Sequence, residues 1–496
     1  MLTKRPRRSM PKVRTGCSTC RTRRIKCDEQ RPECRKCVST GRNCPGYLVP
    51  IHQPPAITIY NIPFKVPGSR SDRELLHFYH CKASESLSRF SDSTLWIDFM
   101  MQRMQHQPVI RNALVALSSL YKDFLQPGRS CLSGSPQHIV IITKAHKQLR
   151  THLLSRDASP EVALICSLIF YILECLVGNS QQAIWHLDQG LILLQRCQRE
   201  YPGAVSAPEF GHLMAVFSRL DIHASIFDSE RVPVLNIVKS LGFLPTVPDA
   251  FVDLSDAEQS LTVMENRLMH HIISSLEHRE KAEEEIPSDI IQERHQLKIQ
   301  FQRLECVIEN LLLAVQEEAQ NLQRQQRVLL LHIQAMIFHA ALLENLCLYS
   351  DNTNLTIDAN RRFHLALSKI KTLLSSCPES HSTSSNREFT LSTNIIAVLY
   401  YICMKTKNHR ILKTALSLIQ GCSVSTRDGL WDASTAASVV QSLVPCDSHE
   451  DDNSEMIKLE DVGAGIVDTS GGLEEAFRLL RIMESSGPEI INIEAA

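Results

Sequence analysis

The sequence predicts a mostly α-helical protein, in which a small cysteine-rich domain at the N-terminus precedes a large all-α body. Three observations lead to this prediction. Six of the 17 cysteines fall within residues 17–44 at regular spacings, whereas the others are scattered singly. Apolar residues in the rest of the chain recur every three to four positions, which is the period of an α-helix. Strand-like alternation is nearly absent, so stacked helix pairs are the expected architecture.

Charge is distributed unevenly along the chain. The 496 residues carry a formal net charge of −1, but residues 1–48 contain 14 Lys and Arg and only three acids, a charge of +11 that leaves −12 for the remainder. A short basic segment on an acidic chain suggests contact with nucleic acid. The hydrophobic content of 43% is enough for a sizeable soluble core.

The cysteine count bears on the redox compartment. The total of 17 is odd, and the N-terminal stretch Met-Leu-Thr-Lys-Arg lacks the apolar core of a secretory signal. Both features argue against a disulfide framework and favour a reducing compartment, in which thiols are available to bind metal.

The clustered cysteines form a duplicated pattern, C-x2-C-x6-C, then six residues, then C-x2-C-x6-C again. The second trio repeats the first at an offset of 17 residues. The six residues are Cys17, Cys20, Cys27, Cys34, Cys37 and Cys44. A structural zinc takes about four ligands in a tetrahedron, so a single zinc would leave two thiolates idle. Two zinc ions need eight ligand positions, which six sulfurs fill only if two of them bridge both metals.

The symmetric choice is that Cys17 and Cys34, the first of each trio, are the bridging ligands. Cys20 and Cys27 then complete one zinc site, and the last two cysteines complete the other. About thirty residues cannot fold on a hydrophobic core of their own. Metal binding, worth ~10–16 kcal/mol in small zinc domains, would therefore supply the folding energy. A ribbon or knuckle with a single zinc is the alternative arrangement.

Residues 17–44 closely resemble the binuclear zinc-cluster domain of fungal Zn(2)-C6 transcription factors. The resemblance rests on the cysteine spacing, the run CRTRRIKC, Pro32 between the trios and the exit CPGY. It implies two zinc ions per chain, a nuclear location, and sequence-specific regulation of RNA polymerase II genes through double-stranded DNA. In that family a first short helix lies in the major groove. Two basic residues of its x6 arm, matched here by Arg23 and Arg24, read a triplet that is typically CGG.

The distribution of basic residues agrees with this resemblance. The first x6 arm holds four Arg and Lys residues and the second holds only one, so the first half should face the DNA. An Arg can pair bidentately with O6 and N7 of guanine, which suits a GG step. We expect Arg23 and Arg24 to contact bases, and Arg21, Lys26 and Arg14 to contact phosphates. For each of them, neutralisation of the DNA backbone alone stays open.

The chain is expected to have five segments. These are a basic arm (1–13), the zinc-cluster domain (14–46), a proline-rich linker (47–70), an all-α regulatory domain (71–445) and an acidic tail (446–496). The arm holds KRPRR and KVR, which suit nuclear import, phosphate contact or both, or which form a solvated tail. The linker region shows no heptads, which argues against a coiled coil directly after the cluster. The tail is either an activation segment that contacts the transcription machinery or a solvated extension.

Helical periodicity starts at Ser71–Glu74, which reads as a capping box. The helices are expected at about 72–90, 93–104, 107–125, 136–155, 159–177, 180–199, 208–226, 255–280, 288–348, 357–375, 388–405, 408–420 and 431–443. The run Val162–Val177 is almost wholly apolar, but it is short for a membrane span and contains Glu174. With Pro160 at its first turn and Gly178 after its end, it reads as a buried helix, and no membrane partner is expected.

One row of apolar residues in the body keeps 4-3-4-3-4 spacing. It consists of Leu297, Phe301, Leu304, Ile308, Leu311 and Val315. The row is either the inner face of a core helix or a short coiled-coil seam of a homodimer. Two other stretches, 98–120 and 183–194, resemble the helical regulatory region of the same family. They resemble a subgroup found beside secondary-metabolite gene clusters, which implies a pathway-specific regulator.

No enzyme motif stands out, and we expect a protein that is not an enzyme. The sequence lacks G-x-S-x-G, Walker A and H-E-x-x-H patterns, and Gly463-Ala-Gly465 has Asp468 where a dinucleotide motif needs its third glycine. The pair His270-His271 reads as surface or core rather than as metal ligands. A competing hypothesis is a zinc-dependent scaffold for protein or RNA. A small effector bound by the helical body is compatible with the first hypothesis.

Overall fold

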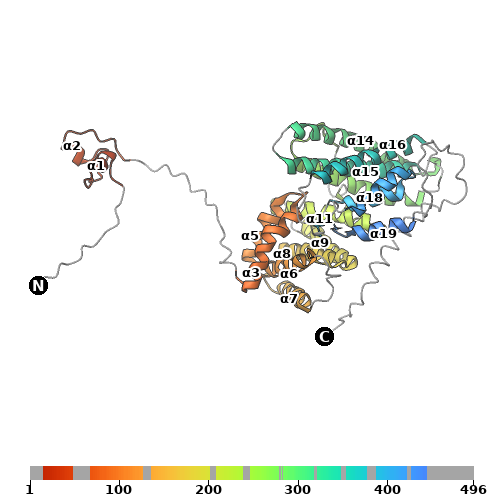
Figure 1. Ribbon diagram of the computed structural model, residues 1–496, viewed down its shortest axis with the longest axis horizontal. Coiled ribbons are helices and arrows are strands. Elements are labelled where there is room, and N and C mark those ends of the chain that lie inside the picture. Colours follow the sequence, from red (N-terminus) through yellow and green to blue (C-terminus); the bar gives the residue numbers. More distant parts are fainter. Residues whose placement is uncertain are drawn as a thin grey trace. The chain divides into compact units, whose positions relative to one another are not determined.

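The computed structural model describes residues 15–47, 67–126, 136–200, 208–237, 246–278, 281, 283–317, 321–347, 353–376, 387–391, 393–421 and 426–443. The described residues fall into two units, the cysteine-rich cluster and the helical body (Figure 1). The predicted basic arm, Arg14, most of the predicted linker, Gly463 and the predicted acidic tail lie outside the described residues.

The cluster unit has two short helices, α1 (Ser18–Thr22) and α2 (Arg35–Val38). Its interior consists of cysteine side chains, five of them buried and Cys27 partly buried, with Tyr47 packed against them. The two aliphatic residues that the sequence offers for a core, Ile25 and Val38, are exposed by 40% and 57%. Among residues 15–47 the interior thus has no aliphatic side chains, and we expect the folding of this part to depend on what the sulfurs bind.

The first half of the body is a stack of helices. Its elements are α3 (Arg70–Phe78), the π-helical turn η2 (Tyr79–Ala83), α4 (Ser84–Ser88), the π-helical turn η3 (Thr94–Phe99), α5 (Met100–His106), α6 (Pro108–Phe124), α7 (Pro136–Leu153), α8 (Pro160–Val177), α9 (Ser180–Glu200) and α11 (Pro208–Phe227). The apolar helix α8 packs against α6 and α9 and forms the centre of the larger of two hydrophobic cores.

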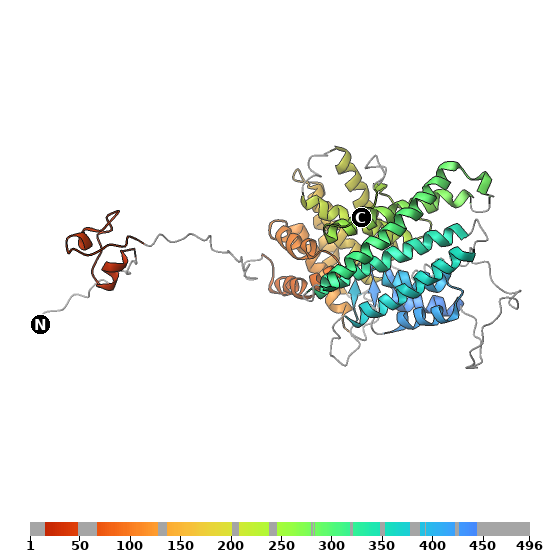
Figure 2. The same ribbon diagram turned by 90° about the horizontal axis from the view of Figure 1, so that it is seen from above.

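The second half adds long helices and three very short strands. Its elements are α13 (Leu254–Ser275), η4 (Leu276–His278), η5 (Glu283–Glu285), α14 (Ser288–Glu317), α15 (Leu322–Cys347), α16 (Thr353–Ser375), β1 (Phe389–Thr390), α17 (Ile395–Lys405), α18 (His409–Gln420), β2 (Arg427–Asp428), β3 (Trp431–Asp432) and α19 (Ala433–Leu443). Figure 2 shows the long helices α14, α15 and α16 packed side by side. Helix α15 borders both cores, since Ile333 belongs to the larger one and Leu342 to the smaller.

The expected mostly α-helical fold is confirmed, with local corrections. The predicted capping box at Ser71 is wrong by two residues: the Ser69 hydroxyl accepts a hydrogen bond from the Asp72 N–H at 3.1 Å, and the Asp72 carboxylate accepts one from the Ser69 N–H at 2.9 Å. The predicted helix 288–348 consists of two helices, α14 and α15. The predicted helices 388–405 and 431–443 both begin later, because strands β1 and β3 occupy their first residues.

The apolar helix α8 is a core helix, as predicted. Pro160 is its first residue and Gly178 follows its end in a left-handed conformation (φ 89°), although the Ser159 side chain makes no capping bond. Among the described residues, Pro160–Val177 and Leu322–Asn345 are long and apolar enough to cross a membrane by length and composition. Within the body, 72% and 89% of these windows are buried, which is what core helices require.

The apolar row on α14 faces the interior of the same chain. Leu297, Phe301, Leu304 and Ile308 each have 0% exposure and pack in the smaller core with α13 and α15. Of the two interpretations of this row, the structure supports the core helix rather than a coiled-coil seam.

Candidate functional site

Each trio of cysteines begins at the N-terminus of a short helix. Cys17 is the N-cap of α1, and its sulfur accepts a hydrogen bond from the Cys20 N–H at 3.4 Å. Cys34 is likewise the N-cap of α2, but its sulfur accepts no capping hydrogen bond. The second cysteine of each trio lies one turn into its helix, so its sulfur points to the same side as that of the first. Both helices thus direct two sulfurs toward one point.

The six sulfurs divide into two sets of four. In each set all sulfurs lie within 4.8 Å of one another. One set is Cys17, Cys20, Cys27 and Cys34, and the other is Cys17, Cys34, Cys37 and Cys44. The shared members, Cys17 and Cys34, are the two residues that the counting argument assigned as bridges, and their sulfurs lie 3.7 Å apart.

The geometry of these sets fits zinc. A tetrahedron with Zn–S bonds of about 2.3 Å has S···S edges of about 3.8 Å. The Cys20–Cys34 and Cys17–Cys37 sulfur pairs lie at 3.6 Å and 3.7 Å. Burial raises the pKa of the Cys20 and Cys34 thiols. Because zinc binds thiolates, its charge would have to remove these protons, and loss of zinc would return them. The six cysteines can therefore hold two zinc ions.

The backbone repeats itself across the two halves. After α1, the Ile25 N–H donates to the Cys20 carbonyl at 3.2 Å; after α2, the Arg42 N–H donates to the Cys37 carbonyl at 3.0 Å. In each half, the residue before the donor makes a second bond, to the carbonyl three residues before it. The two bonds together form the Schellman arrangement, which ends a helix with a left-handed residue. The sequence offset of 17 is thus a structural pseudo-twofold repeat.

The left-handed positions differ between the halves in residue type. Gly41 (φ 62°) and Gly46 (φ 76°) occupy them in the second half. The corresponding residues of the first half are Arg24 (φ 56°) and Glu29 (φ 56°). For a residue with a Cβ this conformation costs about 1–2 kcal/mol, whereas glycine adopts it freely. The first half therefore carries backbone strain at two points where the second half does not.

The predicted DNA-contacting residues differ in how freely they are presented. Arg21, Arg24 and Lys26 are exposed. Arg23 is half-buried, and its Nη1 donates a hydrogen bond to the Thr40 hydroxyl at 3.2 Å. Thr40 is the pseudo-twofold equivalent of Arg23, so this bond crosses between the halves. Arg14 lies outside the described residues.

Two residues that the sequence analysis did not single out fix the cluster. The Asp28 carboxylate accepts hydrogen bonds from the Arg35 and Lys36 N–H groups at 3.0 Å and 3.3 Å, which caps α2 in place of a Cys34 side-chain bond. Two effects act on the pKa of Asp28 in opposite directions. Desolvation raises the pKa, but the hydrogen bonds from these N–H groups lower it further, so that it lies below its ordinary value. The Tyr47 hydroxyl donates to the Gln30 carbonyl at 2.6 Å. The sequence does mark Asp28 as a difference between the halves, because the matching position 17 residues later is Pro45.

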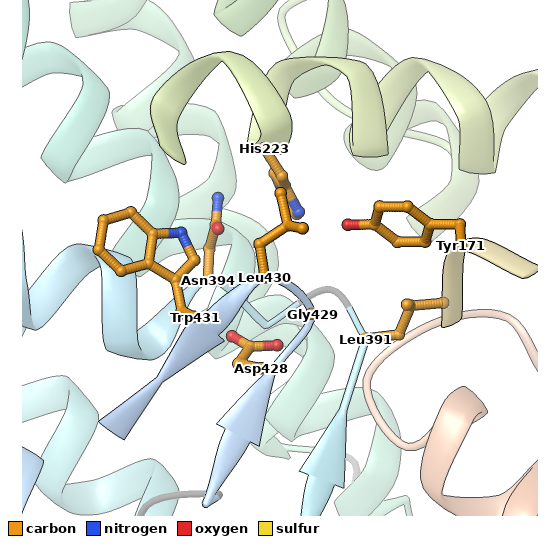
Figure 3. A pocket seen from close by; sticks show the side chains of 8 residues that line it. All are labelled: Tyr171, His223, Leu391, Asn394, Asp428, Gly429, Leu430 and Trp431. Atoms are coloured by element: carbon orange, nitrogen blue, oxygen red, sulfur yellow. The ribbon is translucent and has the colours of Figure 1, made fainter. Parts of the chain in front are cut away.

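The body contains a small buried polar site around Asp428 (Figure 3). Its carboxylate accepts hydrogen bonds from the hydroxyls of Thr390 and Thr393, and burial raises its pKa. Burial also lowers the pKa of the nearby His223 to about 3, so that this histidine is neutral. The cavity that these residues line has a volume of about 10 Å³, which is room for one water molecule. The hydrogen bonds of this site join β2 to β1 and to Thr393 beyond it, and its cavity is too small for an organic effector.

Two family models match the chain. The model of the fungal Zn(2)-Cys(6) binuclear cluster domain matches residues 15–53, and that of the fungal specific transcription factor domain matches residues 74–399. Since the second match covers more than half of the chain, the protein belongs to the family of fungal specific transcription factors.

Curated relatives include transcription regulators of other fungi. The chain is 27% identical to the aspercryptin biosynthesis cluster-specific transcription regulator atnN of Emericella nidulans, over 45% of this chain and 42% of that protein. It is 28% identical to the transcription regulator lscL of Purpureocillium lilacinum, over 34% of this chain and 46% of that protein. The matched region thus spans less than half the length of each relative. No solved structure is significantly similar to the chain.

Proposed function

We propose that the protein is a sequence-specific DNA-binding transcription regulator of RNA polymerase II genes that reads CGG-type half-sites. The observation that carries this proposal is the division of six sulfurs into two sets that share Cys17 and Cys34. Exposed basic residues lie beside these sets, between Cys20 and Cys27. Small zinc-bound modules present a short helix to the major groove of DNA in this way.

In this proposal Cys17 and Cys34 bridge two zinc ions. Cys20 and Cys27 complete one tetrahedron, and Cys37 and Cys44 complete the other. Two zinc ions and six thiolates carry a net charge of −2, which the surrounding Arg and Lys residues offset. The role of the metal would be structural, because the six cysteines would hold α1 and α2 together by binding it.

Arg24 is the principal base-contacting residue in this proposal. It is exposed and follows α1 in a left-handed conformation, so its side chain leaves the end of the helix that enters the major groove. Arg23 contacts a neighbouring base, and for this its guanidinium gives up the hydrogen bond to the Thr40 hydroxyl and donates to the base instead. Arg21 and Lys26, with Arg14 before the cluster, contact phosphates and fix the register.

The proposal extends to location and partners. The protein acts in the nucleus, forms a homodimer, and contacts the transcription machinery through its acidic residues 446–496. Regulation specific to one secondary-metabolite pathway is proposed from the resemblance to regulators such as atnN, whose name gives that role.

Fluorescence anisotropy with the full chain tests this proposal, using a CGG duplex and a duplex of the same composition with the triplet scrambled. At about 1–3 kcal/mol for each mismatched base pair, scrambling should weaken binding at least ~100-fold. The affinity should also fall steeply with salt, because several phosphates are neutralised. Equal affinity for both duplexes would contradict the proposal and favour a zinc-dependent scaffold for protein or RNA.

A further inference from the structure

A patch of basic side chains lies where helix α18 begins beside α16. The Thr406 hydroxyl, in the turn before α18, donates a hydrogen bond to the side-chain oxygen of Asn360 on α16 at 3.2 Å. This bond holds the turn against α16, and basic residues of both elements are exposed next to it. They are Arg361, Lys407, Arg410 and Lys413, which we call the basic patch.

The basic patch is not neutralised by acids of the body. None of its residues forms an ion pair with an acid in the described part of the chain, whereas buried arginines such as Arg231 and Arg362 pair with carboxylates. The nearby Glu344 on α15 is half-buried, and burial raises its pKa although Lys405 and Lys407 lower it. The first turn of α18 contains no acid either, so the positive end of this helix adds to the charge of the patch.

The acidic charge of the chain lies almost wholly after the last described helix. Residues 49–446 contain 36 Lys and Arg against 38 acids, whereas residues 447–496 contain three against 13. The first part of this segment, 447–455, holds five acids and no Lys or Arg, and we call it the acidic stretch. Its charge is opposite to that of the basic patch, as an electrostatic contact requires.

Helix α19 ties the acidic stretch to the neighbourhood of the patch. Helix α18 packs against both α16 and α19 (Figure 1). It has 12 residues and is therefore about 18 Å long. Residues 444–455 follow α19 directly and span up to ~40 Å when they are extended. The acidic stretch can thus reach the basic patch without a movement of the body.

We propose that the acidic stretch docks on the basic patch of the same chain. This inference goes beyond the proposed function and does not depend on it, because docking requires neither DNA nor another protein. A single exposed ion pair contributes little, but several pairs on a short tether act at an effective concentration in the millimolar range. Docking would compete with any contact that these acids make with the transcription machinery.

Cross-linking of the zinc-loaded full chain with a carbodiimide tests the proposal, because this reagent joins amines directly to carboxylates that touch them. We expect mass spectrometry to find amide links from Lys407 and Lys413 to the acidic stretch. The links should form within one chain, so a mixture of isotopically light and heavy chains should yield few mixed links. High salt during the reaction should reduce the yield, because the charges are exposed.

Reversal of charge on the patch gives the sharper test. Arg410→Glu/Lys413→Glu should lower the yield of links from Lys407 severalfold, because it places acids opposite the acidic stretch. Both positions lie near the start of α18, where an acid is compatible with the helix. The matched control is Lys144→Glu/Lys147→Glu, an exposed pair with the same spacing on α7, which should leave the yield unchanged.

Reversal of charge on the acidic stretch completes the series. Glu450→Lys/Asp451→Lys/Asp452→Lys should lower the yield of links from Lys407 in the same way. Combining this triple variant with the reversed patch should restore links between the two segments, because opposite charges face each other again. A combined variant that stays without links would contradict an electrostatic contact.

Three further results would overturn the proposal. Links from Lys407 and Lys413 could be no more frequent than links from Lys144 and Lys147, or be indifferent to the reversals. The acidic stretch could link chiefly to residues 1–48, which would assign it to the cluster. Links chiefly between light and heavy chains would assign it to a second copy. Binding of a CGG duplex by the same variants is measured separately, so failure of the proposed function would be seen independently.

Discussion

The two halves of the cysteine cluster have the same backbone but different surfaces. Each half has an N-cap cysteine, a short helix, a Schellman turn and two left-handed positions. The second half fills those positions with Gly41 and Gly46, which is the least strained choice. The first half fills them with Arg24 and Glu29 and holds most of the basic residues. Duplication thus provides an internal reference that separates what the metal fold needs from what the first half adds.

This comparison shows that the fold does not require the strain at Arg24. An unstrained glycine serves the same turn 17 residues later, with a φ of 62° against 56°. Strained backbone residues persist only where the surrounding structure enforces them, and they cluster at functional sites. Glu29 is held differently, since its carboxylate accepts a hydrogen bond from the Thr15 hydroxyl. Arg24 is exposed, so the DNA contact proposed for its side chain would account for the departure from symmetry.

The largest expected effect separates shared from unshared cysteines. Cys17→Ala or Cys34→Ala should abolish both zinc sites and unfold residues 15–47, because metal binding supplies about 10–16 kcal/mol to such domains. Cys44→Ala should cost only the second site and leave one zinc bound. Zinc per chain, measured on the purified full-length protein, distinguishes these results. Retention of two zinc ions by Cys17→Ala would refute the bridging assignment.

Arg24→Ala should reduce discrimination between CGG and a scrambled triplet by about 1–3 kcal/mol, which is the usual contribution of one bidentate contact. The zinc content should not change, because the side chain contacts no sulfur. Anisotropy titrations with both duplexes provide the measurement. Equal weakening on both duplexes would mean that Arg24 only neutralises phosphate.

The third comparison uses one basic residue from each half of the cluster. Arg21→Ala should weaken binding to every sequence alike and reduce the slope of log affinity against log salt by about 1. Arg42→Ala, in the second half, should leave both the affinity and the slope nearly unchanged. If the two variants behave alike, the assignment of the first half to the DNA-facing side is wrong.

The smallest effects concern the backbone itself. Gly41→Ala should destabilise the cluster by about 1 kcal/mol, because alanine resists the left-handed conformation. Arg24→Gly should stabilise it by about 1 kcal/mol or less, while it removes the base contact. Competition for zinc with a chelator reports both changes as shifts of the midpoint. A loss of stability in Arg24→Gly would show that the arginine side chain supports the fold.

Much of the fold could be predicted from the sequence because its signals are local. Pro160 and Gly178 mark the ends of α8, and a count of ligands picks out Cys17 and Cys34 as the shared pair. The errors occur where distant residues decide. The first residues of the predicted helix 388–405 form β1 instead, because Thr390 and Thr393 donate hydrogen bonds to the buried carboxylate of Asp428.

Within the site, the spacing could not reveal how Arg23 and Arg24 differ. They are adjacent and chemically identical, yet one is bonded to Thr40 and the other lies in the left-handed conformation. That difference arises from the pseudo-twofold packing of the two halves. For these two arginines, the sequence hint is Gly41, whose position 17 residues after Arg24 becomes meaningful once the turns are superimposed.

We propose above all that two zinc ions on six cysteines build a module whose first half reads DNA. Native mass spectrometry of the full chain, titrated with a CGG duplex and a scrambled one, tests both parts together. The account predicts two zinc ions per chain and a complex that forms preferentially with the CGG duplex. One zinc ion per chain, or two without any preference between the duplexes, would contradict it.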